Sequence, residues 1–417
     1  MDIYQKRVKL YKAIKKIYRE LDKQNIKNSE KPHTVISALF DLQNGNREDI
    51  PESIQKLYDD FSDDFAALDI VGNLYSMAGA SDGHGLGIVL TPSSVTNLMC
   101  DLIDVNADSH VLDLCAGAGA FPVSAINHGA NQIKAVELQP SIAKLAFANI
   151  GLAGNDFPDV IVDDAFKFDG YGDFGPDRFL CNPPYSYDEK GMPFVLQGLK
   201  YMKKSGLCAV IIMSQAGNGA AVKTNQSILK YNTLLCSIKM PDKLFYPSAS
   251  VGTSIYIFKA GVPHDFNKPV RFISFKDDGF YRSKKSLRAA DNPAEKYARV
   301  LDLWRSDKTF DDKHNEEVID DVITDSGDDW NFDKHYEVDL RPKPSYFYKT
   351  VADYQDWMRK EYQEDYDRRM MKKLDGELPM DAPDNSEFYN DNMSISWPDY
   401  VKQVMSYPEY NNKDKTK

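Results

Sequence analysis

The chain has few cysteines, no long apolar run and no histidine pair spaced for metal binding. Its five cysteines stand singly in 417 residues without a C-x-x-C pair, so we expect reduced thiols and no redox motif. The longest apolar run, Leu207–Met213, is far shorter than the roughly 20 residues of a membrane span. The N-terminal residues lack the apolar core of a signal peptide, which favours a cytoplasmic protein. Because the seven histidines are dispersed, no metal site is expected.

A basic excess is also missing. Residues 301–417 contain 29 Asp and Glu against 17 Lys and Arg, whereas residues 1–300 contain 34 of each. Affinity for nucleic acid comes largely from Lys and Arg that displace counterions, and an acidic region repels phosphates. The chain is therefore not a simple basic DNA clamp.

Hydrophobic patterning predicts three domains. Residues 1–85 carry helical patterns, with an apolar stripe on the first of them and further helices at 35–42 and 54–74. A glycine-rich segment follows at 78–87, which we interpret as a linker or a mobile loop. Residues 86–262 alternate apolar runs with helical patterns. Residues 263–417 are acidic and aromatic-rich, and we expect an α-rich partner-binding or accessory region with helices at 294–304 and 346–374.

The middle zone predicts an α/β fold. Seven strands are expected at 111–114, 133–138, 160–163, 178–181, 207–213, 234–240 and 254–259. Helices are expected between them at 120–128, 141–152, 193–203 and 221–231. This alternation is typical of a doubly wound, mostly parallel sheet of the Rossmann-like kind, with helices on both faces.

A glycine-rich turn follows the first of these strands. The sequence from Asp113 to Phe121 reads DLCAGAGAF, and Glu137 ends the next strand. Glycines at such a turn let the backbone approach a ligand, and a carboxylate at the second strand end can bind both ribose hydroxyls. Taken singly, Asp113 could be a capping or turn residue and Glu137 an exposed strand end. Together they favour a nucleoside cofactor, and the missing third glycine argues against a dinucleotide.

The sequence Asn182-Pro183-Pro184-Tyr185 directly follows the fourth strand. Two prolines fix their own φ angles and force Asn182 into an extended conformation, which makes the turn rigid. The Asn side-chain oxygen and nearby main-chain carbonyls can then hold an amino group by its hydrogens, and Tyr185 offers a face for a planar ring. In isolation the same four residues could be an ordinary proline turn.

These motifs resemble, in order and spacing, the AdoMet-dependent methyltransferases that make N6-methyladenine in DNA. The segment from Gly87 to Thr91 and Pro92 is similar to the G-x-x-x-T-P segment of the γ arrangement in that family. The stretch 240–258 resembles modification (M) subunits of type I restriction–modification systems. The resemblance covers roughly residues 69–260. The N-terminal region is shorter than in that family, and alanines at 118 and 120 replace commoner turn residues.

The resemblance implies a role for each matching residue. The cofactor S-adenosyl-L-methionine (AdoMet) would be bound by Gly87, Thr91, Pro92, Asp113, Gly117, Ala118, Gly119, Glu137, Asp164 and Phe166. Within that set, Asp113 would hold the methionyl ammonium end, Glu137 the ribose, and Asp164 with Phe166 the adenine. Asn182, Pro183, Pro184 and Tyr185 would form the catalytic turn, in which Asn182 and the Pro183 carbonyl bind the target amine. Tyr185 would stack on the adenine, and Phe245 or Tyr246 is a second stacking candidate that reads equally well as a core aromatic.

The resemblance further implies an adenine-specific DNA methyltransferase that acts on a flipped adenine in double-stranded DNA. A separate specificity subunit and a second copy of the M subunit are the expected partners, with no membrane partner. Two alternatives stay open at this point. One is an NPPY enzyme that methylates a protein glutamine or RNA, because the turn suits any planar amino group. The other is a non-catalytic interaction protein that retains the fold.

Overall fold

A computed structural model describes residues 3–82, 90–155, 158–246, 251–283, 286–338 and 344–382. They divide into two units, residues 1–337 and residues 338–417, and each is described by itself. The predicted separation of residues 1–85 from 86–262 lies within the first unit and stays a prediction.

The first unit begins with helices α1 (Ile3–Lys23), α2 (Lys31–Gln43), α3 (Glu52–Phe61), α4 (Phe65–Leu68) and α5 (Ile70–Asp82), with a 3₁₀ turn η1 (Ser62–Asp64) before α4. The apolar stripe predicted for the first helix is confirmed: Leu10, Ile14, Ile17 and Leu21 of α1 are all buried. The single helix predicted over 54–74 is wrong. Asp69 adopts a left-handed φ of 51°, which an α-helix does not tolerate, so the chain forms separate helices there.

The predicted glycine-rich linker is partly helical. Its first residues, up to Asp82, belong to α5, and residues 83–89 lie outside the described part of the chain.

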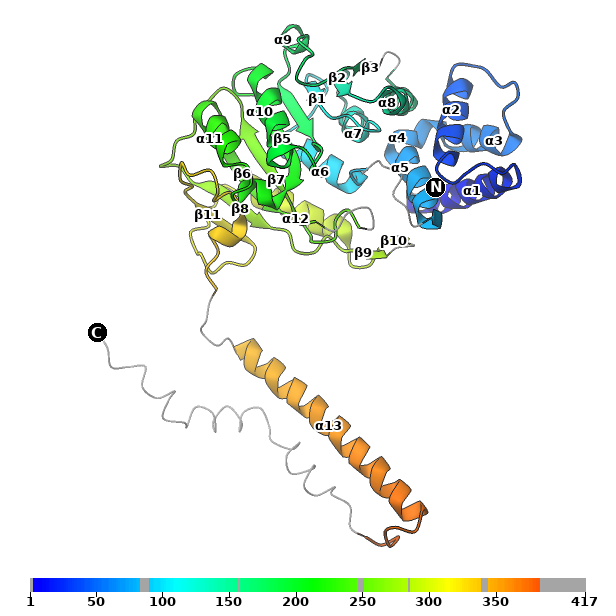
Figure 1. The fold of residues 1–417 in the computed structure, drawn as a ribbon, viewed down its shortest axis with the longest axis vertical. Helices are drawn as coiled ribbons and strands as arrows, with labels where there is room; N and C mark the ends of the chain where they lie inside the picture. Colours follow the sequence, from blue (N-terminus) through cyan, green and yellow to red (C-terminus); the bar gives the residue numbers. More distant parts are fainter. Residues whose placement is uncertain are drawn as a thin grey trace. The chain divides into compact units, whose positions relative to one another are not determined.

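A nine-stranded sheet forms the centre of the first unit (Figure 1). Its strands are β1 (His110–Asp113), β2 (Gln132–Glu137), β3 (Asp159–Val162), β4 (Arg178–Cys181), β5 (Leu207–Met213), β6 (Thr233–Lys239), β7 (Thr253–Lys259), β8 (Val270–Ser274) and β11 (Val318–Asp321). They lie in the order β11-β8-β6-β7-β5-β4-β1-β2-β3. Strand β7 is antiparallel to both β5 and β6, β11 is antiparallel to β8, and the other pairs are parallel.

The doubly wound fold predicted from the sequence is confirmed, and all seven expected strands are present to within one residue. The strand count of seven is too low, because β8 and β11 come from the region expected to be accessory and extend the sheet beyond β6. Strand β11 reads VIDD, so its short apolar part is hidden in an acidic stretch.

Helices cover both faces of the sheet. They are α6 (Ser93–Leu102), α7 (Ala120–Asn127), α8 (Pro140–Leu152), α9 (Tyr171–Phe174), α10 (Met192–Tyr201), α11 (Val222–Tyr231) and α12 (Pro293–Arg305). Alternate residues of each strand point to opposite faces: Leu112 of β1 packs with residues of α10 and α11, whereas Val111 packs with residues of α6, α7 and α12. The N-terminal helices pack on the same unit, α2 against α8 and α4 against α7.

The remaining elements are short. They are the 3₁₀ turns η2 (Asp188–Gly191), η3 (Ser214–Gly217) and η4 (Phe332–Lys334), and a hairpin of β9 (Phe280–Ser283) and β10 (Ser286–Ala289). The second unit contains the 31-residue helix α13 (Pro344–Leu374), which confirms the helix expected there. In the described part of the chain, no helix combines the length and apolarity that crossing a bilayer requires.

An ion pair joins the last strand to the sheet. Arg271 of β8 donates two hydrogen bonds to Asp320 of β11, at 2.8 and 2.9 Å, and also donates to main-chain carbonyls at the end of α12. Both side chains are largely buried, and the hydrogen bonds to Asp320 raise the pKa of Arg271.

Replacing Asp320 by alanine leaves a buried guanidinium without its counter-ion. We expect this change to lower the free energy of unfolding by about 3–5 kcal/mol, measured by urea denaturation. The matched control is Glu317→Ala, which breaks the exposed Arg299–Glu317 pair near the same strand and should cost about 0–1 kcal/mol. Equal effects of the two changes would contradict a special role for the buried pair.

Candidate active site

The predicted site residues follow the ends of neighbouring parallel strands. Asp113 ends β1 and Glu137 ends β2, while Asp164 is the second residue after β3 and Asn182 comes directly after β4. These four strands are adjacent and parallel, in the order β3-β2-β1-β4. Their carboxyl ends therefore meet at one edge of the sheet, where ligands bind in open α/β folds.

The glycine turn between β1 and α7 has two left-handed residues. Gly117 has a φ of +51° and Gly119 a φ of +83°. A Cβ at Gly119 would lie 3.3 Å from the carbonyl oxygen of Ala146, so this glycine lets the turn pack closely on α8. A Cβ at Gly117 would meet no atom nearer than 4.0 Å, so its Cα faces open space. The turn is thus closed on the α8 side and accessible at Gly117.

Asp113 is a completely buried carboxylate with one free oxygen. Its Oδ1 accepts a hydrogen bond from the backbone N–H of Cys115 at 3.0 Å, and its Oδ2 has no partner among the described residues. Burial, with a smaller contribution from the nearby Glu137, raises the pKa of Asp113 to about 7. A buried carboxylate oxygen without a partner is costly, and a cationic ligand at this position would relieve that cost.

The Glu137 carboxylate stabilises the glycine turn by accepting backbone hydrogen bonds. Its Oε2 accepts a hydrogen bond from the N–H of Gly117 at 3.0 Å, and its Oε1 accepts one from the N–H of Gln139 at 2.9 Å. Each carboxylate oxygen retains a further lone pair for a ligand hydroxyl. Ala118 is buried, and its carbonyl accepts a hydrogen bond from Asn149 of α8. Its contribution to the turn is therefore its backbone.

Exposed apolar side chains gather beside the ends of β2 and β3. Asp164 accepts a hydrogen bond from the N–H of Phe166 at 3.0 Å. The Phe166 ring, 36% exposed, stacks on Tyr187 with centroids 5.6 Å apart and planes 18° apart. Leu138, next to Glu137, is 66% exposed. These rings and Leu138 offer an apolar surface to a planar group, next to the carboxylates.

Leu138 and Tyr187 were not among the residues predicted from the sequence. The signal for Leu138 was available: it is an apolar residue placed directly after an acidic strand end, where the chain turns outward. Tyr187 gave no comparable signal, because its contact with Phe166 depends on the path of the loop after β4.

The side-chain amide of Asn182 is oriented by Thr91. Asn182 Nδ2 donates a hydrogen bond to Thr91 Oγ1 at 3.0 Å, across 91 residues of sequence. Thr91 is only 7% exposed, and the next residue, Pro92, caps the N-terminus of α6. With the amide nitrogen engaged in this way, Asn182 Oδ1 is left as the acceptor that can bind a ligand donor.

Gly191 packs closely against the two prolines that follow Asn182. Gly191 has a φ of +91°, and a Cβ there would lie 3.0 Å from Pro183 Cβ and 3.1 Å from the Pro184 carbonyl oxygen. Pro183 is buried and Pro184 is exposed. The Pro184 carbonyl accepts a hydrogen bond from the N–H of Tyr187, so the loop folds back on the turn.

The Tyr185 side chain is more buried than we would expect of a residue that only stacks on a ligand. Its ring meets Phe245 edge-on, with centroids 6.4 Å apart and planes 79° apart. Its hydroxyl is buried without a partner among the described residues, and burial raises its pKa. Phe245 is itself buried in the core on the α6 side of the sheet. The stacking roles of both residues stay predictions.

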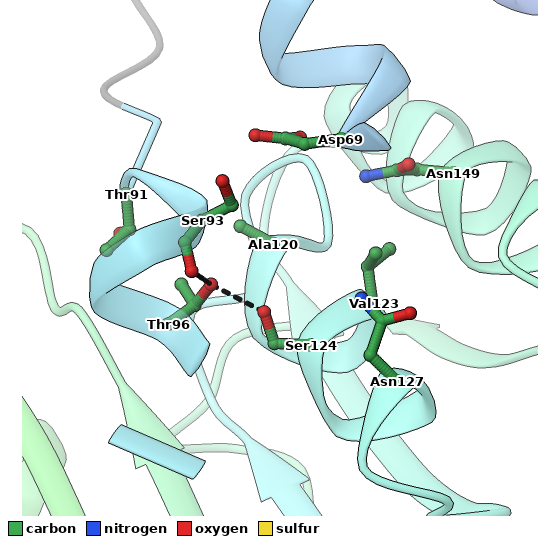
Figure 2. Close-up of a pocket in the computed structure, with 9 residues that line it drawn as sticks. All are labelled: Asp69, Thr91, Ser93, Thr96, Ala120, Val123, Ser124, Asn127 and Asn149. Carbon is green, nitrogen blue, oxygen red and sulfur yellow. Dashed lines mark hydrogen bonds between the residues drawn. The ribbon is translucent and has the colours of Figure 1, made fainter. Parts of the chain in front are cut away.

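Thr91 also lines a small polar pocket (Figure 2). Its lining comes from the turn between α4 and α5, the segment before α6, and helices α6, α7 and α8. The lining residues are Asp69, Thr91, Ser93, Thr96, Ala120, Val123, Ser124, Asn127 and Asn149. The hydroxyls of Thr96 and Ser124 are hydrogen-bonded across it at 2.5 Å. Burial raises the pKa of Asp69, and the N–H of Gly72 opposes this shift. The pocket is thus lined both by Asp69 of the N-terminal region and by Thr91, which accepts the hydrogen bond from Asn182.

Most of the residues predicted from the sequence thus lie along one edge of the sheet. Gly87 is the exception that lies outside the described residues. Among the described residues there is no group of three His, Cys, Asp or Glu side chains arranged to hold a metal ion.

Comparison with known proteins identifies the family. The N-6 DNA methylase family model matches residues 66–193 and 188–340, more than half of the chain. The chain belongs to the N-6 DNA methylase family. A type II restriction enzyme and methyltransferase, RM.BcgI of Heyndrickxia coagulans, is 32% identical over 69% of this chain and 49% of its own length. The type I MjaIX methylase subunit of Methanocaldococcus jannaschii is 22% identical over 52% of this chain and 46% of its own.

The chain spans about half the length of these two curated relatives. Solved structures share its fold. A chain described as a modification subunit of a type I restriction enzyme from Vibrio vulnificus YJ016 matches with a TM-score of 0.53 and 17% identity, covering 68% of this chain and 67% of its own. A class I S-adenosylmethionine-dependent methyltransferase from Listeria monocytogenes matches with a TM-score of 0.51 and 17% identity, covering 72% and 98%.

Proposed function

We propose that this chain transfers a methyl group from AdoMet to the N6 amine of adenine in DNA. It would act as the modification subunit of a type I-like restriction–modification system, with a separate specificity subunit and a second modification subunit. The proposal rests on two oxygen atoms at one edge of the sheet. Asp113 Oδ2 has no partner among the described residues, and Asn182 Oδ1 belongs to the amide that Thr91 orients.

The residues at the glycine turn fit AdoMet. The buried Asp113 carboxylate suits a cationic ammonium, Glu137 has lone pairs left for ribose hydroxyls, and Phe166 with Leu138 offers an apolar surface for a purine. Gly117 provides the open approach. When bound, AdoMet supplies an electrophilic methyl group attached to a sulfonium.

The turn after β4 would hold the target. Asn182 Oδ1 and the Pro183 carbonyl accept the two hydrogens of the adenine amine, which directs the nitrogen lone pair toward the cofactor side. No covalent enzyme intermediate is needed, because the site contributes orientation and the exclusion of water. The base must leave the duplex for this, at a cost of a few kcal/mol of stacking and pairing.

The partner assignment rests on charge. The acidic excess of residues 301–417 disfavours a sequence-reading DNA surface there, so reading the DNA sequence is assigned to another subunit. Purified alone, the chain should bind AdoMet but methylate duplex DNA poorly, and addition of the specificity subunit should raise the rate. Efficient site-specific methylation by this chain alone would contradict the partner assignment.

The substrate class is tested with methyl-tritiated AdoMet offered with duplex DNA, RNA or protein, each with and without the specificity subunit. Label in DNA, recovered as N6-methyladenine after nuclease digestion, supports the proposal. Label in protein or RNA alone refutes it in favour of another NPPY substrate. Failure to bind AdoMet by calorimetry would instead favour a non-catalytic protein.

Thr91→Val removes the hydroxyl that accepts the Asn182 hydrogen bond while keeping the side-chain volume. We expect kcat to fall about 10- to 100-fold, because the amide is then free to rotate away from its acceptor orientation. Thr91→Ser should restore most of the rate. AdoMet affinity is measured by calorimetry on the same proteins, to separate this positioning role from a direct contact with the cofactor. If Thr91→Val lowered AdoMet affinity but left kcat unchanged, the positioning role would be contradicted.

A further inference from the structure

The helix α1 has a basic face that the overall charge count conceals. Between residues 3 and 23 the helix has eight Lys and Arg against two acidic residues, whereas the rest of residues 1–300 has 26 against 32. Five of the basic residues, which we call the α1 basic face, recur at spacings of three, four, three and four: Lys9, Lys12, Lys16, Arg19 and Lys23. At this spacing they lie on one side of the helix.

All five side chains of the α1 basic face are exposed, and the opposite side of the helix is fixed in the core. Lys16 lies 4.0 Å from Glu20, a distant contact on the same helix. The other four have no carboxylate within ion-pair distance in the described part of the chain. The face therefore presents a fixed row of cations, about 21 Å long at 1.5 Å of helix rise per residue.

We propose that the α1 basic face binds the phosphate backbone of duplex DNA. The inference rests on the proposed function, which makes DNA the substrate. A protein with a net charge of −12 repels DNA as a whole, so it needs a local row of cations to bring the duplex close. The face contains only Lys and Arg, suited to phosphates and without groups that select bases, so the contact is independent of sequence.

The N-terminal helices place this face on the first unit, which also contains the proposed active site. Helix α2 packs against α8, which supports the glycine turn, and α4 packs against α7, which follows it. DNA held by α1 is thus bound to the same unit that presents Asn182. The face complements the specificity subunit, which would supply sequence recognition.

The test is duplex-DNA binding by the full chain, measured by fluorescence anisotropy over a range of salt concentrations. The variant carries Lys9→Gln, Lys12→Gln, Arg19→Gln and Lys23→Gln, which keeps helix propensity and leaves the Lys16–Glu20 contact in place. We expect affinity at low salt to fall at least about tenfold and the slope of log K against log salt to decrease by about three to four, equally for unrelated DNA sequences.

A control variant removes the same number of exposed basic residues elsewhere on the unit: Lys203, Lys204, Lys223 and Lys230, each changed to Gln. Its salt slope should match the wild type. An equal loss in both variants means a net-charge effect and overturns the proposal. Carbodiimide cross-links from Lys9, Lys12 or Lys23 to acidic residues of the same chain that persist with saturating DNA would also overturn it, because the face would then bind protein.

The outcomes separate this inference from the proposed function. If the wild-type chain binds DNA with a salt dependence that the α1 variant loses, but no methyl is transferred, the proposed function fails and the DNA-binding face stands. If methyl transfer to DNA occurs and the α1 variant binds DNA as the wild type does, the face is refuted and the proposed function stands. Calorimetric AdoMet affinity should be unchanged in the variant, which shows that the catalytic unit is folded.

Discussion

Replacing Asn182 by alanine should lower the rate of methyl transfer by about 10³-fold or more while leaving AdoMet affinity within about threefold of the wild type. The reason is that Asn182 Oδ1 is the acceptor left available by the Thr91 hydrogen bond, and the side chains of the two prolines that follow it cannot accept a hydrogen bond. The measurement is a single-turnover assay with tritiated AdoMet under conditions in which the wild type labels DNA. Cofactor affinity is measured separately by calorimetry, so that the two effects are not confused.

The matched variant is Asn182→Asp. An aspartate retains an acceptor oxygen at the same position, and the Thr91 hydroxyl can donate to its other oxygen. We expect this variant to keep part of the activity that the alanine variant loses. If alanine and aspartate were equally inactive, the loss would reflect disruption of the turn; if alanine retained full turnover, the proposed role of Asn182 would be wrong.

Much of the first unit, residues 1–337, could be predicted because its signals are local. Each of the seven predicted strands is a short apolar run beside a helical pattern, and the strand ends that carry Asp113, Glu137 and Asn182 meet because parallel strands share an edge. The glycine turn was predictable for the same reason. Gly117 and Gly119 have a left-handed φ, and glycine is the residue type that adopts this conformation readily.

What the sequence did not reveal depends on long-range contacts. Strand β11 is stabilised by a pairing with β8 and by the Arg271–Asp320 ion pair, neither of which its acidic sequence indicates. The Thr91–Asn182 hydrogen bond joins residues 91 positions apart, and only the folded chain brings them together. The break at Asp69 was also missed, because the apolar spacing around it continues as in one helix.

The distribution of charge shows how an average can mislead. Residues 1–300 have no net charge, which argued against a basic DNA-binding surface, yet the α1 basic face concentrates cations on one helix. Helical geometry brings residues three and four apart onto one surface, so the local pattern matters more than the total.

Replacing Asp113 by asparagine should weaken AdoMet binding at least about 30-fold and at the same time stabilise the cofactor-free protein at pH 8. The first effect follows from losing a buried charge opposite a cation, which typically costs 2–5 kcal/mol or more. The second follows because Asp113 is buried and one of its oxygens has no partner in the part of the chain that the structure describes, so its charged form is costly in the free protein. A gain in stability of about 1–3 kcal/mol is expected, since the buried amide recovers only part of that cost.

The pH dependence has a definite sign. Burial raises the pKa of Asp113 from 3.8 to about 7, so the folded protein binds a proton between roughly pH 4 and 7 that the unfolded chain does not. The stability of the cofactor-free wild type should therefore fall as pH rises through this window, by roughly 4 kcal/mol from this group, and stay low above it. In the Asp113→Asn variant this contribution disappears.

AdoMet binding should show the opposite trend. Because the carboxylate form attracts the ammonium, wild-type affinity should weaken by up to about tenfold for each pH unit below 7 through this group, and the variant should lack that component. Thermal unfolding with and without AdoMet, from pH 5 to 8, measures both effects together. Asp108→Asn, an exposed carboxylate before the same strand, is the control and should behave as the wild type. An Asp113→Asn protein that binds AdoMet normally would remove the central support for a cofactor site at this turn.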